Sequence, residues 1–132
     1  MIVLDTSAIL AVLEREPEAE GFIRKMADAP GCLVSAATLV EAGIVTLARR
    51  GPAGSHFLSA LLVRAGVHTV EVDDEQAQVA VEAYQRYGKG RHPAGLNFGD
   101  CFSYALARAK GAALLYKGDD FSQTDVQRAG DE

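Results

Sequence analysis

Two acidic positions each follow a short apolar run that has the character of a buried strand. Asp5 comes directly after residues 2–4 (IVL), and the pair Asp119-Asp120 follows residues 112–116 (AALLY) after a two-residue gap. If both runs are parallel strands of one sheet, their carboxyl ends lie at the same edge and the acids lie close together. Each position also has an ordinary alternative, since Asp is common at helix caps and in turns.

Two further acids belong to predicted helices. Asp100 follows Gly99 in the first turn of a helix, where free backbone N–H groups and the helix dipole favour a carboxylate, whether or not it binds a ligand. Glu41 lies on an apolar helical segment with no basic residue three or four positions away. Such a glutamate either serves a site, faces solvent, or pairs with a more distant base such as Arg49 or Arg64.

Four carboxylates gathered in one pocket would repel one another. Two of them about 6 Å apart repel by roughly 3 kcal/mol at an effective dielectric constant near 20. Either protons or divalent cations must therefore occupy the pocket, and ligand sets made only of oxygen suit Mg²⁺ and Mn²⁺. A cation held in this way can orient a water and stabilise negative charge on a phosphodiester.

The elements that must position these acids alternate along the chain. The sequence predicts strands over 2–4, 32–34, 68–72 and 112–116. It predicts helices over 7–14, with Thr6 or Ser7 near the cap, and over 18–28, 36–50, 55–65, 74–87 and 100–110. Strands separated by helices indicate an α/β fold with a parallel sheet covered on both faces, here as one domain over residues 1–132.

Composition narrows the class of protein. The net charge of −5 argues against a basic protein that coats nucleic acid. No apolar run is long enough to span a membrane, and the first residues lack the features of a signal peptide, so we expect a cytoplasmic protein. The two cysteines, Cys32 and Cys101, form no metal-binding pair and fit a reducing compartment.

Several rival activities lack their sequence signatures. A phosphatase with an aspartyl nucleophile needs a second Asp two residues after the first, where this chain has Ser7. A receiver domain needs an acidic pair at the first strand, and an NTPase needs a phosphate-binding loop, and neither is present. The histidines have no HExxH spacing. A module that keeps the fold and binds RNA or protein without catalysis stays open as an alternative.

Four stretches, in order along the chain, carry a resemblance to a known family. They are IVLDTSAILAVL from residue 2, SAATLVEAG from residue 35, HPAGLNFGDCFSYALA from residue 92 and LLYKGDDFSQTDV from residue 114. Together they resemble the PIN-domain ribonucleases, and especially the VapC toxins of bacterial toxin–antitoxin pairs. The resemblance implies a three-layer sandwich in which helices flank a central parallel sheet of four or five strands.

The resemblance also implies which residues form the site. It implies an acidic metal site made of Asp5, Glu41, Asp100 and Asp119, with Asp120 possible in place of Asp119. Thr6 or Ser7 matches the hydroxyl residue that the family has beside its first Asp, where it helps to place metal or water.

The resemblance further implies the activity and the partners. The activity is that of a Mg²⁺-dependent (or Mn²⁺-dependent) endoribonuclease, in which a water attacks an RNA phosphate in line and leaves 5′-phosphate and 3′-hydroxyl ends. The expected partners are a second copy of the chain and a VapB-type antitoxin, in a hetero-oligomer. The apolar helical stretches within 7–28 and 36–65 supply candidate surfaces for both.

RNA must still approach an acidic molecule, so basic residues near the acids are candidate phosphate contacts. Lys89, Arg91 and His92 lie in the glycine-rich loop before the Asp100 helix, and Lys117 lies beside the acidic pair. A solvated surface loop explains the first three equally well. Asn97 is expected to cap the helix that contains Asp100.

Overall fold

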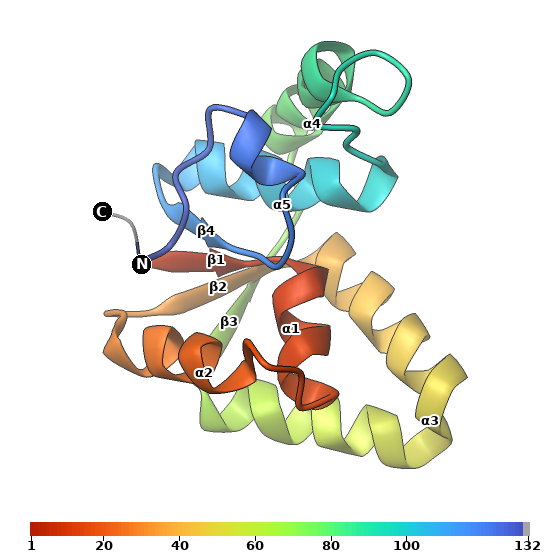
Figure 1. Ribbon diagram of the computed structural model, residues 1–132, viewed down its shortest axis with the longest axis vertical. Helices are drawn as coiled ribbons and strands as arrows, with labels where there is room; N and C mark the ends of the chain where they lie inside the picture. The colour runs from red at the N-terminus through yellow and green to blue at the C-terminus, as the bar shows by residue number, and fades with distance from the viewer. Residues whose placement is uncertain (131–132) are drawn as a thin grey trace.

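The central sheet has four parallel strands in a computed structural model that describes residues 1–130. The strands are β1 (Ile2–Leu4), β2 (Cys32–Ser35), β3 (Val67–Val70) and β4 (Ala113–Leu115), in the spatial order β3-β2-β1-β4. β1 pairs with β2 on one side and with β4 on the other, in parallel register (Figure 1). The first strand therefore lies in the interior of the sheet, and its carboxyl end is surrounded by other elements.

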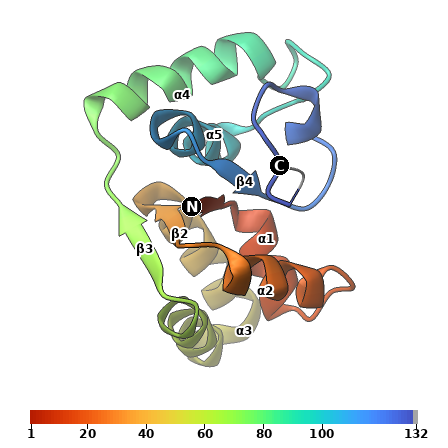
Figure 2. The same cartoon turned by 90° about the vertical axis from the view of Figure 1, so that its left-hand side faces the viewer.

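Five helices cover the two faces of the sheet. On one face lie α1 (Thr6–Leu13), α2 (Ala19–Asp28) and α3 (Ala36–Arg64), and on the other lie α4 (Asp74–Tyr87) and α5 (Phe98–Lys110), as Figures 1 and 2 show. Successive strand residues point to opposite faces, so Val3 joins the core under α4 and α5, whereas Ile2 and Leu4 join the core under α1 to α3. The predicted three-layer α/β sandwich is confirmed, and its sheet has four strands within residues 1–130.

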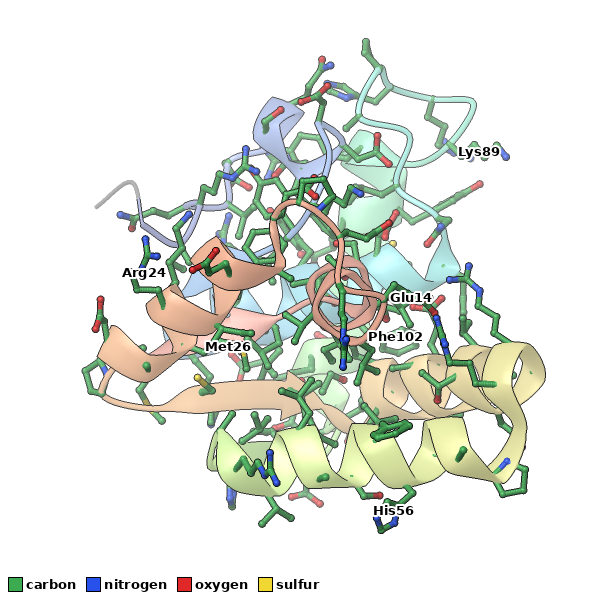
Figure 3. All side chains as sticks on the ribbon, turned by 60° about the horizontal axis from the view of Figure 1, so that its bottom comes forward. Glu14, Arg24, Met26, His56, Lys89 and Phe102 are labelled. Carbon is green, nitrogen blue, oxygen red and sulfur yellow. The ribbon has the colours of Figure 1, made fainter. Side chains whose placement is uncertain are left out.

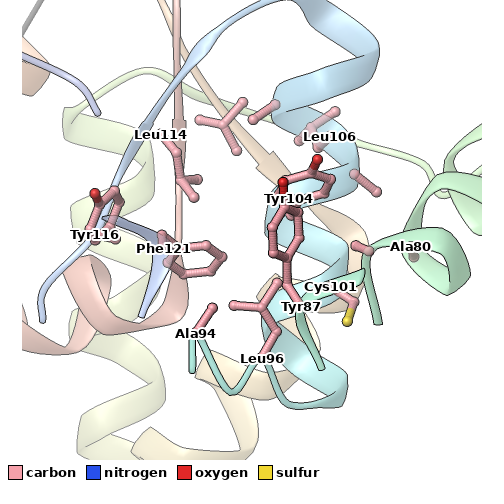
Figure 4. Packing of buried hydrophobic residues seen from close by; sticks show 14 of the residues in the cluster. Ala80, Tyr87, Ala94, Leu96, Cys101, Tyr104, Leu106, Leu114, Tyr116 and Phe121 are labelled. Carbon is pink, nitrogen blue, oxygen red and sulfur yellow. The ribbon is translucent and has the colours of Figure 1, made fainter. Parts of the chain in front are cut away.

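Side chains from strands, helices and the last segment fill the core on the α4 and α5 side. Tyr87, Tyr104, Leu106, Leu114 and Phe121 are all buried there, and Figure 4 shows how they pack. This packing fixes α5 against the sheet. It also holds the short 3-10 turn at Phe121–Gln123, which follows the Asp119-Asp120 pair.

Three predicted helix boundaries need correction. Within α3 the predicted helices 36–50 and 55–65 are separated at Gly51, whose φ of 64° and ψ of −157° are not helical, and the second helix begins at Pro52, before its predicted start. The helix resumes at once because proline, here Pro52, is tolerated at a first helical position. The expected cap of α5 at Asn97 is confirmed: Asn97 and Asp100 form a reciprocal capping box, so the helix begins at Phe98, two residues before the predicted range.

The third correction concerns the cap of α1. Asp5 is the N-cap residue, so Thr6 and Ser7, predicted near the cap, are the first two residues of the helix, which begins one residue before the predicted start. The Asp5 carboxylate accepts a hydrogen bond from the Ser7 backbone N–H. The residues after β4 close the outer edge of the sheet. The Leu114 N–H donates to the Gln127 carbonyl at 2.8 Å, and the Ala129 N–H donates to the Leu114 carbonyl at 2.9 Å.

Within residues 1–130 no helix is long and apolar enough to cross a bilayer.

Candidate acidic active site

Asp5 is held rigidly at the carboxyl end of β1. Its side chain is buried, with 3% of the residue surface exposed. Oδ2 accepts hydrogen bonds from the Ser7 N–H at 3.0 Å and the Ser7 hydroxyl at 2.6 Å, and Oδ1 accepts one from the Ser103 hydroxyl at 2.6 Å. Asp5 therefore caps α1 and also presents a fixed carboxylate at the functional edge of the sheet.

Glu41 lies in the second turn of α3 and turns toward the same edge. The Thr6 hydroxyl donates to its Oε1 at 2.5 Å, and the residue is half-buried. Among the described residues Glu41 forms no ion pair with Arg49 or Arg64, and Arg49 instead lies 4.0 Å from a Glu14 carboxylate oxygen. A glutamate held by a single hydroxyl keeps its negative charge uncompensated.

The pKa of Asp100 reflects both its burial and the other acids that lie near it. Its pKa is raised to about 6, chiefly by burial, while the hydrogen bond donated by the Asn97 N–H opposes the shift. The negative charges of Asp5, Asp120 and Glu41 raise the pKa further. Residues separated by almost the whole chain thus meet where β1, α3 and α5 converge.

The two residues of the last acidic pair differ in their surroundings. Both are exposed, and Asp120 begins the 3-10 turn without making a side-chain capping bond to it. Asp120 is among the charges that raise the pKa of Asp100, and Asp119 is not. The Asp119 backbone carbonyl instead accepts hydrogen bonds from the N–H and hydroxyl of Ser122.

Hydroxyl side chains form hydrogen bonds with the acids or beside them, and two of these hydroxyls were not predicted from the sequence. Ser7 was a predicted supporting residue, and its hydroxyl also accepts a hydrogen bond from the Lys117 N–H at 3.0 Å. Ser103 and Thr38 were missed; their buried hydroxyls lie 3.2 Å apart and link α5 to α3. The available signal was spacing, because Ser103 lies three residues after Asp100 and so on the same face of α5.

Two of the four predicted phosphate contacts have partners inside the chain. The Lys117 ammonium lies 3.1 Å from a Glu16 carboxylate oxygen and 3.5 Å from one of Glu18. The hydrogen bond to Glu16 raises the pKa of Lys117. The His92 ring accepts a hydrogen bond from the Ala94 N–H at 3.0 Å. These two side chains therefore contribute to the local structure of their segments.

The other two basic residues face solvent. Lys89 and Arg91 are exposed on the loop between α4 and α5, and Lys89 extends away from the body of the protein in Figure 3. The Arg91 guanidinium lies 5.8 Å from the centre of the Tyr84 ring, a cation–π distance. Both stay available to an anionic ligand.

The donor set fits a hard divalent cation in its chemistry. Every candidate ligand is a carboxylate or hydroxyl oxygen, which Mg²⁺ and Mn²⁺ prefer. Among residues 1–130, no three acidic, histidine or cysteine side chains are grouped tightly enough to form a ready ligand cluster. Asp5, Glu41 and Asp100 are instead held individually, by the capping and hydroxyl hydrogen bonds described above.

Sequence comparison agrees with this arrangement. The PIN domain family model matches residues 2–127. A Ribonuclease VapC from Mycolicibacterium smegmatis is 51% identical over 95% of this chain and 97% of its own. This chain belongs to the VapC ribonucleases of the PIN-domain family. Ribonuclease VapC30 of Mycobacterium tuberculosis is also similar, at 48% identity over 95% of each chain.

Solved structures of low sequence identity share the fold of this VapC protein. VapC20 of Mycobacterium tuberculosis, a toxin that cleaves the sarcin-ricin loop, superposes with a TM-score of 0.75 at 23% identity, covering 96% of each chain. A toxin–antitoxin complex from Klebsiella pneumoniae gives a TM-score of 0.71 at 16% identity, over 95% of this chain and 93% of that one. The three-layer architecture is thus the PIN fold.

Proposed function

We propose that this VapC protein hydrolyses RNA phosphodiester bonds with a Mg²⁺ or Mn²⁺ ion held by Asp5, Glu41, Asp100 and an acid of the Asp119-Asp120 pair. The observation that carries the proposal is that Asp5, Glu41 and Asp100 come together at the carboxyl end of β1: Ser103 of α5 donates to Asp5, and the Glu41 carboxylate lies against Gly99, the residue before Asp100. Burial first, and the neighbouring acids second, raise the pKa of Asp100 to about 6. Within residues 1–130, no Lys, Arg or His forms an ion pair with any of those four acids. A cation from solution would supply the missing positive charge.

For the fourth acid, the surroundings favour Asp120. Its charge acts on Asp100, and its side chain has no capping role in the turn that follows. Asp119, which the sequence reasoning preferred, stays a prediction. Substituting each acid separately decides between the two.

The chain's own residues orient the acids before substrate arrives. Ser7 and Ser103 fix the Asp5 carboxylate, and Thr6 fixes Glu41. Asp100 uses Oδ2 to accept the Asn97 N–H, which leaves Oδ1 for a ligand. When bound, the cation offsets the charge on the acids and on the phosphate under attack. A carboxylate held beside it can accept a proton from the attacking water.

The RNA strand would approach over the loop between α4 and α5. Lys89 and Arg91 are exposed there and follow directly on the helix that packs against α5. We propose that they contact backbone phosphates, which gives modest affinity that depends on salt concentration. Lys117 and His92 would contribute less, because both already have partners within the chain.

Two apolar surfaces are proposed for protein partners. A groove of about 440 Å³ between α1 and α3 is lined by residues that include Val12, Leu13, Phe57 and Leu61, and we propose it for a VapB-type antitoxin. Structural neighbours include a toxin–antitoxin complex from Klebsiella pneumoniae and VapBC2 from Rickettsia felis, which supports an antitoxin as the kind of partner. The apolar groove between α4 and α5, which includes Phe98, is proposed as the homodimer face.

The test of the catalytic proposal is RNA cleavage by the purified full chain. We expect cleavage in Mg²⁺ to stop in EDTA and to fall by about 100-fold or more in Asp5→Asn, because a lost metal ligand costs more than a lost supporting contact. Asp74→Asn, an exposed first-turn acid of α4, is the matched control and should cleave normally. Cleavage that persists in Asp5→Asn, or that ignores EDTA, would contradict a metal site on these acids. A parent chain that cleaves no RNA in Mg²⁺ would leave a non-catalytic binding module as the better account.

A further inference from the structure

Gly99 lies against the carboxylate of Glu41. Gly99 is the second residue of α5, directly before Asp100. A Cβ atom at this position would lie 2.3 Å from Oε2 of Glu41 and 2.7 Å from both its Cδ and its Oε1. These separations are far below van der Waals contact. The Glu41 carboxylate therefore occupies the space that any larger side chain at position 99 would need.

The glycine is not explained by backbone conformation. Several glycines of the chain have positive φ, including Gly51 and Gly111, and Gly99 is not one of them. Within a helix, alanine has a higher intrinsic propensity than glycine. What distinguishes position 99 is the missing side chain itself, because the nearest foreign atoms are all from one functional carboxylate.

The opposite side of Glu41 is also held. The Thr6 hydroxyl at the start of α1 donates to Oε1 at 2.5 Å. The carboxylate at the end of a flexible side chain on α3 is thus confined between the first turns of α1 and α5. Displacing it from Gly99 would disturb the hydrogen bond to Thr6 and change its position relative to Asp100.

We propose that Gly99 is a positioning residue, whose missing side chain seats the Glu41 carboxylate beside Asp100 so that both acids bind one divalent cation. This inference rests on the function proposed above. It adds a residue that contacts neither metal nor RNA and acts only through Glu41. A clash with a side-chain end can be relieved by rotation of that side chain, so the fold is kept while the carboxylate moves.

The first test uses Gly99→Ala in the full chain, with Mn²⁺ affinity measured by electron paramagnetic resonance. We expect affinity to fall by about 10-fold to 100-fold, the range for lost outer-shell support of a metal ligand. The melting temperature without metal should change little. Gly43→Ala is the matched control, since it lies on α3 two residues from Glu41 and a Cβ there meets nothing within 4 Å. It should bind Mn²⁺ like the parent protein.

A double-mutant cycle separates positioning from a general structural effect. In a Glu41→Ala background, adding Gly99→Ala should cost no further Mn²⁺ affinity, because the carboxylate it displaces is gone. An equal loss in both backgrounds, or parental affinity in Gly99→Ala alone, would overturn the proposal. If Gly99→Ala folds poorly, adding Glu41→Asp, whose shorter side chain withdraws the carboxylate, should restore folding; failure to do so would also overturn it.

The outcome distinguishes this inference from the function on which it rests. If the parent chain binds no Mn²⁺ and Asp5→Asn still cleaves RNA, the metal-dependent function is wrong. If both of those results support the function and Gly99→Ala still binds Mn²⁺ normally, only the role of Gly99 is wrong.

Discussion

The carboxylates near the two ends of helix α5 have opposite electrostatic surroundings. Near its C-terminal end, Asp125 contacts the Arg108 guanidinium, lies 3.8 Å from Arg86 and accepts the Tyr104 hydroxyl at 2.5 Å. Burial alone would raise the pKa of Asp125, but the Tyr104 hydrogen bond and the Arg108 charge outweigh it and lower the pKa. At the N-terminal end, Asp100 has acids for neighbours, and its pKa is raised to about 6.

The difference shows what each end of the helix is built for. The Asp125 cluster balances its charge within the chain, so it stabilises the fold without any ligand. The Asp100 cluster leaves negative charge unbalanced, which reduces stability and favours a cation from solution. Comparing variants at the two ends therefore separates residues that serve the fold from residues that serve the reaction.

The largest expected contrast is in RNA cleavage. Asp100→Asn should lower the cleavage rate in Mg²⁺ by about 100-fold or more, since it removes a metal ligand. Asp125→Asn should leave the rate within about 2-fold, because a surface ion pair contributes little beyond stability. A fluorescent single-stranded RNA substrate measures both rates. Equal losses in the two variants would show that the comparison does not divide catalysis from folding.

The second contrast is in the free energy of unfolding, which should rise in Asp100→Asn and fall in Asp125→Asn. In EDTA at pH 7.5, Asp100→Asn should raise the free energy of unfolding by about 1 kcal/mol, because it removes a charge that burial and, to a smaller extent, the neighbouring acids disfavour. Asn keeps an oxygen for the capping bond from the Asn97 N–H. Asp125→Asn should lower the free energy of unfolding by about 0.5–1 kcal/mol.

Urea unfolding monitored by circular dichroism gives both values. A destabilised Asp100→Asn would indicate that its capping role outweighs charge repulsion, and the central claim would lose its support.

The contributions of Asp100 and Asp125 to the free energy of unfolding should depend on pH in opposite ways. The folded pKa of Asp100 is raised from 3.8 to about 6, so the folded state binds its proton more tightly than the unfolded state. Its ionisation therefore destabilises the fold as pH rises through about 4 to 6, and the full penalty is present above that window. The pKa of Asp125 is lowered, so its stabilisation is lost as pH falls below its ordinary value near 4.

Unfolding in EDTA at several pH values between 7.5 and 4 tests this directly. The stability advantage of Asp100→Asn over the parent should shrink through the window and vanish near pH 4. An advantage that stayed constant over this range would mean that Asp100 does not titrate there.

Parts of the fold were predictable because hydrophobic pattern and local chemistry determine them. The apolar runs IVL, CLV and AALLY are too short for helices and are rich in β-branched or aliphatic residues, which favours buried strands, and all three contain strands of the sheet. The start of α5 was misplaced by two residues because a capping box satisfies N–H groups through side chains three residues apart. The break at Gly51 was shorter than predicted because Pro52 can begin a helix as well as end one.

The site was predictable only in part, for a related reason. Asp5 follows a strand and Glu41 lacks a basic neighbour, and both facts can be read directly from the sequence. The contact between Ser103 and Asp5 joins residues 98 positions apart and depends on how α5 packs over β1. The seat that Gly99 provides for Glu41 likewise appears only when α3 and α5 are packed together.

A smaller effect, on the pKa of Asp100 and on cleavage, distinguishes Asp120 from Asp119 as the fourth acid. Asp120→Asn should lower the pKa of Asp100, followed by the carboxyl carbon shift in NMR without metal, because it removes one of the charges that raise it. It should also reduce cleavage by about 10-fold, whereas Asp119→Asn should change cleavage by less than about 2-fold. The reverse order of the two variants would return the role to Asp119.

The most direct test of the whole account is the dependence of unfolding free energy on Mg²⁺. For the parent chain at pH 7.5, the free energy of unfolding should rise with magnesium, by about 1.4 kcal/mol at a tenfold excess over Kd. Asp100→Asn should show less than half of that rise, and Asp125→Asn should show all of it. A parent chain whose stability does not change with magnesium, or an Asp100→Asn variant that gains as much as the parent, would contradict the claim that these acids form a cation site.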